Sequence, residues 1–217
     1  MLSKYLIPDH CKLVALGKPT EKESKKWFKR YEKYLPNTGE IVFFDRSWYT
    51  RALVEATMGY CTKRQYTYFM KNVIPWEKKQ IEEGVEFFKF YLSIEKNTQQ
   101  KRIDKRATSP LVYWKISEND LKMLDKWDAF TLYKEQMFKR TSYDEAPWIV
   151  LNANNKKVAI LSALRFILNA FDYPDKDLPK PKLWSEGLNN YKVEINKVLF
   201  ENLSYQQYKT LRVFADE

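Results

Sequence analysis

The sequence predicts an α/β protein in which a parallel sheet carries helices on both faces. Short apolar segments that are typical of buried strands alternate with longer segments of helical spacing. Polar or charged residues follow the apolar segments directly, as Asp45 and Arg46 follow residues 41–44. Because the carboxyl ends of parallel strands meet at one edge of a sheet, where ligands bind in open α/β folds, we expect these polar residues to converge there.

Four apolar segments are the predicted strands. Residues 41–44 are wholly apolar, with β-branched and aromatic side chains, which is typical of a strand buried on both faces. The other predicted strands are residues 12–16, 86–94 and 148–151. Their alternation with helical segments predicts that all of them pair within a single parallel sheet.

Three capping boxes, in which a hydroxyl precedes an acid or amide by three residues, predict where long helices begin. The pairs are Thr20 with Glu23, Thr62 with Gln65, and Ser117 with Asp120. They predict helices over about 20–35, 62–83 and 117–140, and Pro75 is expected to kink or split the second. Further helices are expected at 51–58, ended by Gly59, at 98–105, and at 156–171 with Asn154 as its N-cap.

Composition narrows the class of function. A formal net charge of +10 and a pI near 9.3 favour polyanionic partners: nucleic acid, polyphosphate, nucleotides or an anionic membrane surface. Cys11 and Cys61, without CxxC spacing, and the lack of a signal-peptide pattern predict a reduced, cytoplasmic protein. His10 is the only histidine, which excludes histidine-based zinc sites and Ser-His-Asp catalysis.

The segment after the strand at 41–44 has the residue types of a metal and phosphate site. Asp45 offers a hard oxygen ligand for Mg²⁺, and Arg46 and Arg51 offer guanidinium groups that match phosphate oxygens. The alternative is a buried strand that ends in an ordinary surface Asp-Arg pair.

Residues 44–52 resemble the Walker B region of the polyphosphate kinase 2 family, and other segments agree in the same order. Residues 15–20 are similar to the family's loop after its second strand, 89–94 to its next strand, and 109–117 to its lid. The further similar segments are 127–130, 137–142 and 146–148. The resemblance covers residues 2–177 and implies a P-loop-kinase-like three-layer sandwich with a parallel sheet and a helical lid.

The resemblance also implies a domain division and a function. It implies a kinase domain at 1–172, with a lid at about 98–117, and a proline-rich tail at 173–217. The family transfers the terminal phosphoryl group between inorganic polyphosphate and a nucleoside di- or monophosphate (ADP, GDP or AMP) with Mg²⁺. The family commonly assembles as a homo-oligomer, a dimer or tetramer, and the same is expected of this chain.

The resemblance assigns roles to nine residues. Asp45 would hold the metal, directly or through water, and Arg46 and Arg51 would bind the phosphates at the reacting end. Lys18 lies after the neighbouring strand and would contact phosphate as well. The cations expected to bind polyphosphate from the lid are Lys101, Arg102, Lys105, Arg106 and Lys115. The alternative for the lid is a solvated basic helix.

The family's glycine-rich P-loop, or Walker A loop, is not found in the sequence. The five glycines are too far apart to build it, and Pro19 follows Lys18 where a hydroxyl residue is required. In the family this loop and the first strand precede the helix that ends near Leu6, so we expect a member that is truncated at its N-terminus. Loss of the loop would cost several orders of magnitude in rate, because electrostatic preorganisation is usually the largest catalytic term.

Two other functions compete with phosphotransfer. One is a non-catalytic polyanion-binding or oligomer-forming remnant of such a kinase, which keeps the basic lid and does no chemistry. The other, more remote, is a nucleic-acid-binding domain, which the net charge of +10 and the aromatic content of 16% suggest.

Overall fold

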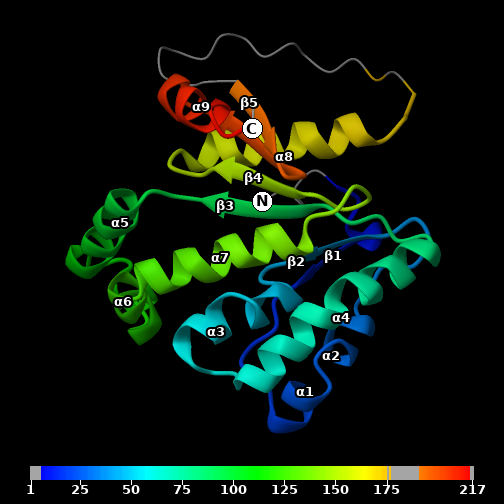
Figure 1. Ribbon diagram of the computed structural model, residues 1–217, viewed down its shortest axis with the longest axis horizontal. Coiled ribbons are helices and arrows are strands. Elements are labelled where there is room, and N and C mark those ends of the chain that lie inside the picture. The colour runs from blue at the N-terminus through cyan, green and yellow to red at the C-terminus, as the bar shows by residue number, and fades with distance from the viewer. Residues whose placement is uncertain (1–5, 175, 177–190, 216–217) are drawn as a thin grey trace. The chain divides into compact units, whose positions relative to one another are not determined.

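The computed structural model (Figure 1) describes residues 6–174, 176 and 191–215, so the helix end expected before Leu6 lies outside the described residues. The chain divides into two compact units. The first unit comprises Met1–Glu86 with Ala129–Arg140, and the second comprises Phe87–Asp128 with Thr141–Glu217. The predicted α/β class with parallel strand pairs is confirmed, but the described strands form two sheets, where a single sheet was expected.

The sheet of the first unit has two parallel strands. β1 (Cys11–Val14) pairs with β2 (Ile41–Phe44) from Cys11 opposite Ile41 to Val14 opposite Phe44. Ile41 is 39% exposed and the other three residues of β2 are only partly buried, so the expectation that residues 41–44 are covered on both faces does not hold. The helices of this unit are η2 (Pro8–His10), α1 (Glu21–Lys25), α2 (Lys29–Glu32), η3 (Trp48–Arg51), α3 (Val54–Met58), α4 (Lys63–Glu82) and most of α7 (Trp127–Thr141).

Aromatic side chains form the core of the first unit. The ring of Tyr31 meets the rings of Trp27 and Trp48 edge-on, at centroid distances of 5.6 and 5.8 Å. Tyr49 meets Phe69 of α4 at 5.6 Å in the same way. Edge-to-face contacts of this kind add to the free energy gained from burying the rings. The core thereby joins α2, η3 and α4 around the segment that follows β2.

Two predicted helices of the first unit differ in the structure. The helix expected at 20–35 is divided into α1 and α2, because the chain leaves helical geometry at Lys26, where the backbone dihedrals are φ −118° and ψ 58°. Trp27 then donates from Nε1 to the carbonyl of Trp48 at 2.9 Å, a long-range bond that outweighs local helix propensity. α4, in contrast, continues through Pro75 without being split. Gly59 ends α3 in the left-handed conformation, as predicted.

The sheet of the second unit has the order β3-β4-β6-β5. β3 (Lys89–Ser93), β4 (Trp148–Asn152) and β6 (Val198–Leu203) run parallel, and β5 (Tyr191–Ile195) is antiparallel to β6. β4 is the most deeply buried strand, and α8 (Lys156–Ala170) packs against β4 and β6 (Figure 1). The remaining helices are α5 (Lys96–Thr108), η4 (Tyr113–Lys115), α6 (Glu118–Asp125) and α9 (Tyr205–Arg212).

Three sequence expectations for the second half of the chain are corrected. The helix expected at 117–140 is two helices, α6 and α7, which meet at Lys126. The N-cap of α8 is Asn155 rather than Asn154, because the Asn155 side chain accepts from the N–H groups of Lys157 and Val158. The segment 173–217, expected as a tail, contains β5, β6 and α9. Asn196 and Lys197, both with positive φ, form the tight turn of this hairpin.

Within the described part of the chain, no helix combines the length and the apolar character that crossing a membrane requires.

Candidate functional site

Asp45 and Arg46 lie at the carboxyl end of β2. The backbone N–H of Asp45 donates to the carbonyl of Val14 at 2.9 Å, which extends the β1–β2 ladder by one step and fixes the position of Asp45. Arg46 follows with φ 67°, a left-handed conformation that is uncommon outside glycine and occurs often at functional sites. Both side chains are exposed, and among the described residues neither makes a hydrogen bond or ion pair. An acid and a base are therefore presented together at this strand end.

The turn after Arg46 is anchored by hydrogen bonds to buried groups. The Ser47 carbonyl accepts from the Tyr31 hydroxyl at 3.3 Å and from Thr50 Oγ1 at 3.1 Å. Trp48 donates from Nε1 to Glu77 Oε1 at 2.8 Å. These bonds explain how the backbone can hold the unfavourable conformation of Arg46, because the surrounding structure fixes both sides of the turn.

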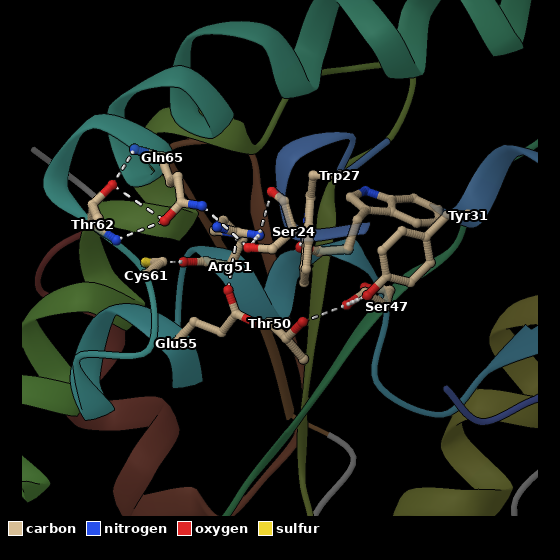
Figure 2. Close-up of polar contacts among 11 residues, drawn as sticks. Ser24, Trp27, Tyr31, Ser47, Thr50, Arg51, Glu55, Cys61, Thr62 and Gln65 are labelled. Carbon is tan, nitrogen blue, oxygen red and sulfur yellow. Dashed lines mark hydrogen bonds and ion pairs between the residues drawn. The ribbon is translucent and has the colours of Figure 1, made fainter. Parts of the chain in front are cut away.

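Arg51, the second predicted phosphate-binding arginine, is enclosed, with only 1% of its surface exposed. Figure 2 shows its guanidinium between Glu55 and Ser24. Its Nε lies 2.9 Å from Glu55 Oε2, and its Nη2 donates to the carbonyl and the Oγ of Ser24 at 3.2 and 3.1 Å. The Trp27 ring lies 3.9 Å from the guanidinium carbon, close enough for a cation–π contact.

Burial of the Arg51–Glu55 ion pair costs free energy, because both charged groups lose water. Burial raises the pKa of the Glu55 carboxyl above its usual value, and the positive charges of Arg51 and Arg30 only partly offset this effect. Arg51 Nη1 is buried and makes no hydrogen bond within the described residues. The arrangement thus holds one guanidinium rigidly beside η3 and leaves its Nη1 amino group without an acceptor among the described residues.

Gln65 connects this cluster to the start of α4. Its side chain completes the Thr62 capping box and donates from Nε2 to Ser24 Oγ at 3.1 Å (Figure 2). Ser24 in turn contacts Arg51, so the orientation of Arg51 depends on α1, α3 and α4 together. The contributions of Ser24 and Glu55 were not predicted, although the i, i+4 spacing of Arg51 and Glu55 within the helix expected at 51–58 was a usable signal.

Lys18 lies in the loop after β1 with its side chain exposed. The loop is held by Arg30, whose Nη2 donates to the carbonyl of Gly17. Because β1 and β2 pair in parallel with Val14 opposite Phe44, Lys18 and Asp45 follow the same end of this sheet. The structure therefore brings Lys18, Asp45 and Arg46 to one edge of the first unit.

The predicted lid cations belong to the second unit and differ in their surroundings. Arg102 donates from Nη2 to the carbonyls of Ala153 and Asn154 at 2.8 and 3.0 Å. Arg106 lies 3.6 Å from Asp120 in an ion pair. Lys101 and Lys105, four residues apart on one face of α5, are exposed and make no ion pair among the described residues.

Lys115, the last of these cations, ends η4, and its side chain lies outside the described part of the structure. The two arginines of α5 are thus engaged by the protein, whereas Lys101 and Lys105 are available to a ligand.

Asp45 fits one mode of magnesium binding, in which a single protein carboxylate holds the ion. Among the described residues, no group of three His, Cys, Asp or Glu side chains is placed to hold a metal ion. Mg²⁺ commonly retains several waters and is bound through one or two carboxylates and the phosphates of a substrate. The single exposed carboxylate of Asp45 satisfies that mode of binding.

Comparison with known proteins places this geometry in a family. The family model described as Polyphosphate kinase 2 matches residues 1–179, which include β1 to β4 and α5. The chain belongs to the polyphosphate kinase 2 family. The resemblance inferred from the Walker B segment and the lid is thereby confirmed.

Relatives within the polyphosphate kinase 2 family are substantially longer than this chain. It is 42% identical over 191 residues to polyphosphate kinase PPK2B of Corynebacterium glutamicum, covering 85% of the chain and 62% of that relative. It is 43% identical over 175 residues to a GDP-polyphosphate phosphotransferase of Mycolicibacterium smegmatis, covering 80% of the chain and 62% of that relative. The chain therefore spans less than two thirds of the length of these relatives.

A solved structure of the family has the same fold. The structure of polyphosphate kinase 2 from Arthrobacter aurescens TC1 superposes with a TM-score of 0.72 at 29% identity, covering 80% of this chain and 64% of that one. The residues of the candidate site all lie within the part matched by the polyphosphate kinase 2 family, whereas β5, β6 and α9 come after it.

Proposed function

We propose that this chain transfers the terminal phosphoryl group between inorganic polyphosphate and a nucleoside di- or monophosphate, with Mg²⁺ bound at Asp45. The observation that supports it best is the exposed Asp45–Arg46 pair at the end of β2, at the same sheet edge as Lys18. The names of the relatives, which include NDP-, GDP- and ADP-polyphosphate phosphotransferases, support polyphosphate and a nucleoside diphosphate as substrates.

Each side chain has a role that follows from its surroundings. Bound Mg²⁺ supplies neutralisation of the negative charge on phosphoryl oxygens. Asp45 would hold it, directly or through water, because its carboxylate is exposed and its backbone is fixed by Val14. Arg46 and Lys18 would neutralise the phosphate oxygens at the same edge, since both side chains reach solvent.

Arg51 would act differently from Arg46. Its guanidinium is already oriented by Glu55, Ser24 and Trp27, so little conformational entropy would be lost if its Nη1 amino group bound a phosphate oxygen. Lys101 and Lys105 would bind the polyphosphate chain, because both are exposed and make no ion pair among the described residues.

A phosphotransfer assay with polyphosphate, ADP or GDP, and Mg²⁺ tests this proposal. We expect Asp45→Asn to lower the rate by about 100-fold or more, the order of effect for loss of one electrostatic group at a reacting centre. Asp9→Asn is the matched control, because Asp9 is also an exposed aspartate of the first unit and lies in η2. Equal activity of the unaltered chain and Asp45→Asn would refute the role of Asp45.

A polyanion-binding function without chemistry is the second candidate, and the enclosure of Arg51 favours it. Under that function the chain would bind polyphosphate with a strong dependence on salt, and would show no transfer in the same assay. Homo-oligomer formation stays a prediction that light scattering on the purified chain would test.

A further inference from the structure

The β5–β6–α9 segment, which follows the family match, is attached to the carboxyl end of β4. Asn202 of β6 has φ 46° and is buried, with 8% of its surface exposed. Its amide makes two hydrogen bonds to the backbone of Asn152: Oδ1 accepts from the N–H at 2.8 Å, and Nδ2 donates to the carbonyl at 2.9 Å. A side-chain amide thus continues the strand ladder at the point where the β6 backbone turns toward α9.

Further amide groups connect this attachment to the end of β3. Gln207 of α9 accepts from Asn152 Nδ2 at 2.9 Å and donates from Nε2 to Glu95 Oε1 at 3.3 Å. The side chain of Asn154 accepts from the backbone N–H of Glu95 at 3.1 Å. The ends of β3 and β4 and the start of α9 are therefore held in one hydrogen-bonded frame.

The frame borders an open cavity of about 340 Å³ within the second unit. This volume lies in the range of small-molecule sites. Apolar side chains supply much of its wall, including Ile94, Phe200, Leu203 and Leu211. Glu95 and the amides of Asn152, Asn154, Gln206 and Gln207 supply its polar groups.

The lining defines the chemistry of the ligand. Among the described residues that line the cavity none is Lys or Arg, so a phosphate group would find no counter-charge there. Carboxamides offer both donors and acceptors, and the Glu95 carboxylate offers acceptors only. The Gln206 side chain makes no hydrogen bond within the described part of the chain. Apolar walls with such a rim match a neutral, flat heterocycle that has donors and acceptors at its edge.

We propose that this cavity binds the heterocyclic base of a nucleotide. The assignment rests on the proposed function for the presence of a nucleotide substrate, and it names the part of the chain that recognises the base. α5 begins directly after Glu95 and carries Lys101 about 9 Å further along its axis. A nucleotide with its base in the cavity can therefore direct its phosphates toward the available cations of the same unit.

Calorimetric titration of the 217-residue chain with adenosine and with guanosine tests the cavity without requiring catalysis. Thr210→Trp places an indole at the cavity wall from an exposed position of α9, and Lys209→Trp makes the same change one residue away, outside the lining. We expect one nucleoside to bind per chain, and Thr210→Trp to weaken binding by about tenfold or more. Lys209→Trp should change it less than about twofold, and Gln206→Ala should weaken it by about threefold to tenfold.

Absence of binding of both nucleosides at millimolar concentration would overturn the assignment, as would equal binding by Thr210→Trp and Lys209→Trp. Tripolyphosphate binding, measured on the same variants, separates this proposal from the proposed function. Nucleoside binding that is sensitive to Thr210→Trp, in a chain that neither transfers phosphoryl groups nor binds tripolyphosphate, would support the base site and refute the proposed function. Phosphoryl transfer and tripolyphosphate binding, without nucleoside binding that is sensitive to Thr210→Trp, would refute the base site alone.

Discussion

At the scale of single residues, the Arg51–Glu55 pair is the feature with the largest energetic consequence. Arg51→Ala leaves the Glu55 carboxylate buried without its nearest counter-charge, and Glu55 is itself largely buried. We expect Arg51→Ala to lower the free energy of unfolding by about 3–5 kcal/mol. The double variant Arg51→Met with Glu55→Leu should recover most of that loss, because it removes both buried charges and keeps the apolar volume.

Urea unfolding, followed by tryptophan fluorescence, measures the free energy of unfolding of the unaltered chain and of these variants. Trp27 and Trp48 report on the surroundings of the pair, since Trp27 packs on the guanidinium. A loss below about 1 kcal/mol for Arg51→Ala, or a double variant no more stable than the single one, would show that the pair is not coupled as the distances indicate.

The ionisation of Glu55 makes stability depend on pH. Burial raises the pKa of Glu55 above 4.5, so the folded state favours the neutral carboxyl more than the unfolded state does. The resulting stabilisation is fully present below about pH 4.5 and is lost as pH rises through the folded-state pKa. Relative to Glu55→Gln, which cannot titrate, the unaltered chain should therefore lose stability as pH rises from 4.5 toward 7.

Urea midpoints of the unaltered chain and Glu55→Gln across that interval test the sign. If the unaltered chain gains stability over Glu55→Gln as pH rises, the ion pair with Arg51 outweighs the cost of burial, and the predicted sign is wrong.

Sequence can predict the position of Asp45 and Arg46, because an apolar strand ends immediately before them. It cannot predict that Arg51 is enclosed, because Trp27 and Ser24 reach it from a segment more than 20 residues away.

At the scale of elements, α5 carries arginines that are bound by the protein and exposed lysines, Lys101 and Lys105, that are available to a ligand. We expect Lys101→Ala with Lys105→Ala to weaken polyphosphate binding and to reduce the slope of log K against log salt by about 1–2, since each lost phosphate contact removes somewhat less than one unit. The thermal midpoint should stay unchanged, because both lysines are exposed. Arg102→Ala is the comparison variant, and it should lower the thermal midpoint because two carbonyls lose their donor.

Fluorescence anisotropy with labelled polyphosphate at several salt concentrations gives both the affinity and the slope. An unchanged slope in the lysine double variant would exclude these two side chains from the binding surface.

The sequence predicts where α5 starts, because a strand precedes it, but it does not predict the length of α5. Its two arginines are engaged by Asp120 and by the carbonyls of Ala153 and Asn154, which are distant in sequence.

Local patterns predicted some elements and missed others for identifiable reasons. The capping boxes at Thr20, Thr62 and Ser117 are all formed, because a capping box depends only on residues three apart. The hairpin of β5 and β6 was missed because prolines dominate the sequence before it and Asn-Lys is a weaker turn signal than Asn-Gly. The parallel pairing of β6 with β4 brings together residues about 50 positions apart, which no local pattern specifies.

At the scale of the whole molecule, the chain enters the first unit twice. Residues 129–140 return to it after the second unit has begun, and within α7 Met137 is 1% exposed whereas Leu132 is 58% exposed. Periodicity predicts that α7 is a helix with a buried face, but it cannot identify the unit against which that face packs. The ring of Tyr133 meets that of Tyr66 in α4 at 5.4 Å, which assigns α7 to the first unit.

This assignment predicts a long-range effect of one side chain. Met137→Ala leaves a cavity in the first unit, so the free energy of unfolding should fall by about 2–5 kcal/mol. Leu132→Ala, an equivalent truncation at an exposed position of the same helix, should change it by less than about 0.5 kcal/mol. Amide hydrogen exchange locates the effect: with Met137→Ala, protection should fall in α4, although α4 ends at Glu82, more than 50 residues before Met137. A loss of protection confined to β3, α5 and β4 would instead assign the buried face of α7 to the second unit, and the two-part division of the chain would need to be redrawn.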